Sequence, residues 1–118
     1  MNSKKPGRLP DDAVEAFDKD GVVVLRNIFT PWVDGVRDAI EENKRRPSWR
    51  ERTYRPDEGD GCEFFQDYCV WSEFAGYRAL VVDSPMAEVA AQLMRSATAR
   101  VFHDHILVKE PGNAVKTP

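Results

Sequence analysis

Apolar residues recur at helical spacing in four parts of the chain. Residues 11–20, 31–45 and 86–97 each carry an apolar stripe, and a further stripe follows Ser72. Residues that recur at intervals of three and four lie on one face of a helix. Ser72 and the Thr-Pro pair at 30–31 are predicted N-cap signals, and a Ser-Pro pair precedes residue 86. The pattern predicts four amphipathic helices that bury one face each.

Two other segments read as β-strands. Residues 22–26, VVVLR, are rich in β-branched residues and read as a buried strand. In residues 100–109, RVFHDHILVK, successive side chains point to opposite faces, so His103, His105 and Lys109 share one face. Two strands do not form a stable sheet alone, so the order helix, strand, helices, strand predicts the first part of a larger domain.

The segment between the second and third helices is polar at first and then aromatic. Residues 47–62 are rich in proline, glycine and charge, which predicts a long loop. The aromatic side chains of residues 63–71 are expected in the core and along a pocket. Cys62 and Cys69 have no metal-binding spacing and are expected to be reduced and partly buried.

Composition narrows the classes of partner. The net charge of −3 in 118 residues argues against nucleic acid or an anionic membrane surface as a partner. The basic cluster that begins at Lys44 is the exception, and it suits the C-terminus of a helix. No apolar run is long enough to span a membrane. Residues 1–10 lack an apolar signal region and are expected to be a flexible lead-in, so the cytoplasm is the expected compartment.

Both histidines of the chain lie in the strand VFHDHILVKEPG, residues 101–112. His103, His105 and Glu110 form a His-x-His-x4-Glu pattern that resembles the first half of a cupin metal motif, and imidazole with carboxylate suits a transition metal. The remaining histidine of that motif is missing, because the chain has two histidines. The simpler interpretation is a polar strand whose histidines make ordinary hydrogen bonds.

A third interpretation comes from a family resemblance. FDKDGVVVLRNIF near the N-terminus, then VFHDHILVKEPG, then NAVKTP, resemble the phytanoyl-CoA dioxygenase (PhyH) family in the same order. The resemblance implies an Fe(II)- and 2-oxoglutarate-dependent oxygenase, with Fe(II) as cofactor and 2-oxoglutarate as cosubstrate. It also implies an α+β fold in which residues 11–118 are the N-terminal helices and first strands of a double-stranded β-helix domain. The implied reaction hydroxylates a small organic substrate, with succinate and CO₂ as coproducts.

The resemblance assigns cosubstrate contacts but no metal ligand in this chain. In the family, HILVKEPG and KTP run into a Trp-His-x-Asp-like motif that supplies the first two iron ligands. Neither histidine here is followed two residues later by a carboxylate, and Pro118 falls about where that motif would begin. Lys109 and Thr117 match residues that contact 2-oxoglutarate in some relatives. His105 and His103 are expected to line the same cavity, because they share the face of Lys109.

Two further interpretations remain open at this stage. One is a non-catalytic short form that acts as a binding or dimerisation module, with the remainder of the domain or a second copy as partner. The other is the small cupin-like metal protein that uses His103, His105 and Glu110. As an isolated polypeptide, the 118-residue chain is expected to have no oxygenase activity, because the iron ligands are missing.

Overall fold

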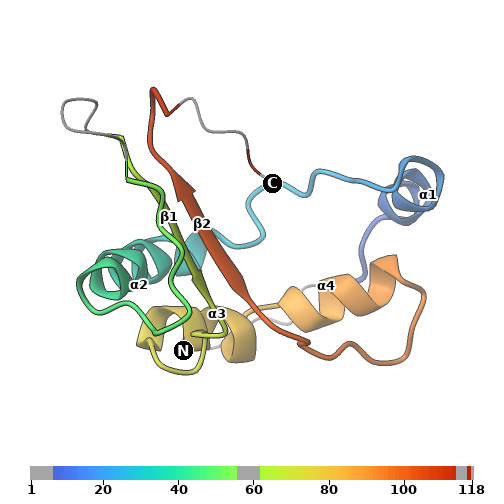
Figure 1. Cartoon of the computed structure of the whole chain (residues 1–118). Helices are drawn as coiled ribbons and strands as arrows, with labels where there is room; N and C mark the ends of the chain where they lie inside the picture. The colour runs from blue at the N-terminus through green and yellow to red at the C-terminus, as the bar shows by residue number, and fades with distance from the viewer. Residues whose placement is uncertain (1–6, 56–61, 114–116, 118) are drawn as a thin grey trace.

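The computed structural model describes residues 7–55, 62–113 and 117. The elements follow in the order α1 (Asp11–Asp20), the 3-10 helix η1 (Thr30–Trp32), α2 (Val33–Arg45), β1 (Phe64–Tyr68), α3 (Ala75–Asp83), α4 (Met86–Leu93) and β2 (His105–Lys109). The two strands lie side by side near α2 and α3, whereas α1 lies beside α4 at the other end of the molecule (Figure 1). The fold is a mixture of helices and antiparallel strands.

The four predicted helices are present, but α4 ends at Leu93 and not at residue 97, and two of the expected caps are wrong. α1 ends at Gly21, whose φ of 72° is left-handed and whose N–H donates to the carbonyl of Phe17. Thr30 makes no side-chain capping bond, because it begins the short 3-10 turn that precedes α2. Ser72 does not cap α3 either, since that helix begins three residues later, at Ala75.

The Ser-Pro pair before α4 does not place Ser84 at the N-cap, which is Pro85, but Ser84 still accepts a hydrogen bond from the first residue of the helix. The backbone N–H of Met86 donates to Ser84 Oγ at 3.2 Å, and the Ser84 hydroxyl donates to the carbonyl of Leu80. Ser84 therefore joins the end of α3 to the start of α4. A serine at this position satisfies one of the unpaired donors at a helix N-terminus.

The prediction of a strand at residues 22–26 is wrong. Residues 22–25 have no regular secondary structure, and Val22 and Val24 are 65% and 73% exposed. β-branched residues favour an extended chain, but a strand also needs a neighbour that completes its hydrogen bonds. No strand among the described residues pairs with this segment.

The strand predicted at residues 100–109 is confirmed over its second half. β2 pairs antiparallel with β1, from Tyr68 opposite His105 to Phe64 opposite Lys109. It begins at His105 because β1 ends at the partner residue. On the outer edge of β1, Tyr54 forms an isolated antiparallel bridge with Phe64, so the loop 47–62 contains a short extended segment. Residues 56–61 of that loop lie outside the described residues.

The core lies between α2, α3 and one face of the sheet. Its buried members are Ala39, Val70, Phe74 and Tyr77, and Ile106 of β2 packs against them. α2 and α3 approach closely where Gly35 faces Gly76, and a Cβ at position 76 would clash with the carbonyl of Gly35. The sheet therefore has one face covered by helices.

The N-terminal segment is anchored at its end. Leu9 is buried, and its N–H donates to Gln92 Oε1 of α4 at 2.7 Å. The first six residues of the segment expected to be flexible, 1–6, lie outside the described residues. None of the described helices is long and apolar enough to cross a membrane.

Candidate functional site

The candidate site lies on the face of the sheet that is turned away from α2 and α3. In β2, His105, Leu107 and Lys109 are exposed, whereas Ile106 and Val108 between them are partly buried. This confirms that His105 and Lys109 share a face. The register places Tyr68, Gln66 and Phe64 of β1 beside them on the same face.

His105 is held by an aromatic contact. Its ring stacks on Tyr68 with 3.8 Å between ring centroids and 26° between the planes. Burial lowers the pKa of His105 below its ordinary value, and the nearby His103 lowers it further, while Asp104 opposes both effects. His105 therefore carries less positive charge near neutral pH than a free histidine does.

His103 lies outside the strand. It is exposed, and its ring meets the edge of Phe102 with 4.9 Å between centroids. Asp104, between the two histidines, accepts hydrogen bonds from the backbone N–H groups of Val70 and Trp71, which fixes the turn after β1. The expectation that His103 lines a cavity with Lys109 stays a prediction.

Lys109 and Thr117, the two residues expected to contact 2-oxoglutarate, are both exposed. The Lys109 ammonium lies 5.6 Å from the centroid of the Phe64 ring, within the range of a cation–π contact. Thr117 follows residues 114–116, which lie outside the described residues. The structure thus places Lys109 and His105 on one surface, and their cosubstrate and cavity roles stay predictions.

Glu110 is not brought together with the histidines. Its carboxylate accepts a hydrogen bond from Lys44 Nζ of α2 at 3.1 Å. Burial would lower the pKa of Lys44, but the bonds and charges of Glu110 and Glu41 outweigh it and raise the pKa. Within the part of the chain that the structure describes, no group of three His, Cys, Asp or Glu residues is placed to hold a metal ion.

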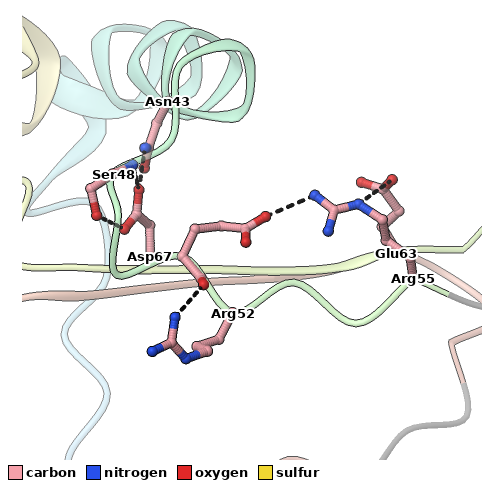
Figure 2. Close-up of polar contacts among 7 residues, drawn as sticks. Asn43, Ser48, Arg52, Arg55, Glu63 and Asp67 are labelled. Atoms are coloured by element: carbon pink, nitrogen blue, oxygen red, sulfur yellow. Dashed lines mark hydrogen bonds and ion pairs between the residues drawn. The ribbon is translucent and has the colours of Figure 1, made fainter.

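A buried polar network supports the site from behind. Asp67 of β1 is fully buried, and its carboxylate accepts hydrogen bonds from Asn43 Nδ2 and from the backbone and side chain of Ser48 (Figure 2). It also accepts a hydrogen bond from the N–H of Tyr68 at 2.8 Å. Burial alone would raise the pKa of Asp67, but these bonds outweigh it and leave the pKa below its ordinary value. Asn43 in turn accepts a bond from the Tyr77 hydroxyl at 3.2 Å. The network ties α2, α3 and β1 together.

A second feature that the sequence did not reveal is an open pocket of about 350 Å³ beside β1. It is lined by Arg52, Thr53, Tyr54, Gln66 and Tyr68. The N–H of Arg52 donates to the carbonyl of Gln66 and that of Tyr54 donates to Phe64, so the segment runs along the strand like a partner. The sequence offers one weak sign of this segment, because Arg52 and Tyr54 are two residues apart and would lie on the same side of an extended chain. The composition of the stretch predicts a loop.

The charged groups around this pocket differ in their partners. Arg55 pairs with Glu51 and Glu63, whereas the Arg52 guanidinium donates to the carbonyl of Glu51 (Figure 2). Among the described residues, no carboxylate forms an ion pair with Arg52. Of the described residues, one cationic side chain and no acidic side chain line the pocket.

Both cysteines are free, and the expected partial burial is found for Cys62 but not for Cys69. Cys62 is partly buried, with its Sγ 3.2 Å from the carbonyl oxygen of Pro111. Cys69 is exposed and has a positive φ of 55° in the turn after β1.

No protein-family model, curated protein or solved structure matches the chain.

Proposed function

We propose that the chain is the N-terminal part of an Fe(II)- and 2-oxoglutarate-dependent oxygenase of the PhyH type, which hydroxylates a small organic substrate. The observation that carries this proposal is the exposed sheet face on which Lys109 and His105 lie together, opposite the helices. In a double-stranded β-helix the inner face of the sheet lines the cavity, while helices cover the outer face. The arrangement here suits that layering.

The shape of the molecule also supports a role as part of a larger domain. Its radius of gyration is 16.6 Å, whereas a compact domain of about 100 residues has a radius near 13 Å. Among the residues that the structure describes, ten large hydrophobic side chains are exposed, including Val22, Val24, Phe102 and Leu107. In the proposal, other parts of the protein cover these side chains.

The described residues do not fit an iron site, since no group of three ligand residues is gathered among them. In the proposal, the iron ligands lie in another part of the protein. The proposed contributions of this chain are a scaffold, the Lys109 ammonium as an ion-pair partner for a carboxylate of 2-oxoglutarate, and the Thr117 hydroxyl as a hydrogen-bond donor to it. His105 would form part of the cavity wall.

Two measurements on the protein from its natural source test the proposal. The first is its intact mass by mass spectrometry, and the second is an anaerobic titration with Fe(II) and 2-oxoglutarate. The proposal predicts a mass well above the 13.4 kDa of these 118 residues and saturable 2-oxoglutarate binding. Lys109→Met should weaken that binding by roughly tenfold, whereas Lys19→Met, at an exposed position on α1, should leave it unchanged. Equal binding by both variants would contradict the assigned contact.

A binding or dimerisation module is the second candidate, because an apolar groove runs along α2. The groove has a volume of about 520 Å³, and Trp32, Val33, Val36 and Ile40 contribute to its lining. Val33 is 47% exposed. This candidate predicts a concentration-dependent dimer in light scattering, and a substitution Val33→Asp should abolish it.

We place the protein in the cytoplasm. The two free cysteines support this proposal, since reduced thiols are typical of that compartment. Detection of the protein in a secreted or periplasmic fraction would contradict it.

A further inference from the structure

The pocket beside β1 has the chemistry of a site for a small organic anion. One wall is the extended segment that contains Arg52 and Tyr54, and the other is formed by Gln66 and Tyr68 of β1. Its volume of about 350 Å³ lies within the range of about 300–1,000 Å³ that is usual for small-molecule sites.

The floor of this pocket is built from a polar side chain that is almost fully buried. Gln66 is 2% exposed, and its Oε1 accepts a hydrogen bond from the Tyr68 hydroxyl at 3.3 Å. This bond occupies Oε1, so the amide nitrogen is the group of Gln66 that can donate to a ligand.

Among the described residues that line the pocket, the charged side chain is that of Arg52. Its guanidinium donates one hydrogen bond to the carbonyl of Glu51, at 2.8 Å. Its other N–H groups have no carboxylate partner among the described residues. Tyr54 and Tyr68 add aromatic surface to the walls. An arginine beside an amide donor suits a carboxylate, and aromatic walls suit a flat or apolar body.

We propose that Arg52, Gln66, Tyr54 and Tyr68 bind the carboxylate end of a small organic acid. The binding site rests on the pocket alone, while its identification as the substrate subsite of the oxygenase rests on the function proposed above. The carboxylate of 2-oxoglutarate, proposed at Lys109, and the carboxylate proposed at Arg52 would bind at different places on the sheet. Lys109 lies opposite Phe64 on the β2 side, and the pocket lies on the far side of β1. The substrate carboxylate is therefore distinct from that of 2-oxoglutarate.

The test uses the metal-free 118-residue chain and sodium benzoate as the probe, with benzamide as its neutral counterpart. Amide chemical shifts of Gln66, Tyr68 and Tyr54 should move saturably with benzoate and much less with benzamide. Arg52→Gln should weaken benzoate binding by roughly tenfold or more. The matched control Arg45→Gln, at an exposed position at the end of α2, should leave it unchanged.

Three results would overturn the proposal: no saturable shift, equal binding of benzamide, or equal loss in both arginine variants. A competition arm with 2-oxoglutarate separates substrate from cosubstrate, because equally tight binding of 2-oxoglutarate at the same residues would overturn the substrate assignment. These readouts need no iron. The anion site and the oxygenase proposal can therefore fail independently.

Discussion

Removal of the Asp67 carboxylate should be among the most destabilising single changes in this chain. In Asp67→Ala, the donors of Asn43, Ser48 and Tyr68 lose their common acceptor inside the protein. Each buried donor left unpaired costs about 1–3 kcal/mol, and the Ser48 hydroxyl can rotate toward another acceptor. We therefore expect a loss of about 3–5 kcal/mol in the free energy of unfolding, against a typical total of about 5–15 kcal/mol for a domain.

Urea denaturation followed by tryptophan fluorescence measures this loss. Asp38→Ala is the matched control, since Asp38 is an exposed aspartate on α2, and it should change the free energy of unfolding by less than about 0.5 kcal/mol. Asp67→Asn keeps one acceptor oxygen, so its loss in the free energy of unfolding should lie between those of the two alanine variants. Equal stability of the two alanine variants would refute the assigned role of the network.

The free energy of unfolding should depend on pH because of the same Asp67 carboxylate. The pKa of Asp67 is lower in the folded chain than its ordinary value, because its hydrogen bonds outweigh the effect of burial. Its stabilisation is therefore fully present above the unfolded pKa of about 3.9 and is lost as the pH falls through the folded pKa. The difference in stability between the wild type and Asp67→Ala should shrink below about pH 4.

Two further changes test the packing and the site face. Gly76→Ala should destabilise the chain by about 1–3 kcal/mol, because the new Cβ clashes with the Gly35 carbonyl. Gly35→Ala meets only ordinary contacts, so its melting temperature should be unchanged or higher. NMR titration should give His105 a pKa below the ordinary value of about 6.5, and Tyr68→Ala should raise it by removing the stacked ring; an unchanged pKa in that variant would contradict burial by Tyr68 as its cause.

The helices could be predicted from the sequence because their signals are local. The stripes of α1, α2 and α4 repeat within a few residues, and the Ser84-Pro85 signal acts on the adjacent helix. The alternation in β2 likewise predicted which side chains share a face. These features depend on neighbours in the chain, which the sequence displays directly.

The features that the sequence missed depend on residues that are distant along the chain. Residues 22–26 have strand propensity, but propensity does not supply a partner strand. Asp67 stood in an aromatic stretch, and its main partners, Asn43 and Ser48, lie about twenty residues earlier. The pocket at Arg52 exists because the segment that contains Arg52 and Tyr54 runs back along β1. Such contacts follow from tertiary packing.

Succinate release tests the central claim most directly. The protein from its natural source would be incubated with Fe(II), 2-oxoglutarate and O₂, and succinate would be measured by mass spectrometry. The account predicts 2-oxoglutarate-dependent succinate from that protein, a strong reduction in Lys109→Met, and none from the isolated 118-residue chain. Absence of succinate and of 2-oxoglutarate binding in the iron-loaded protein would contradict the account.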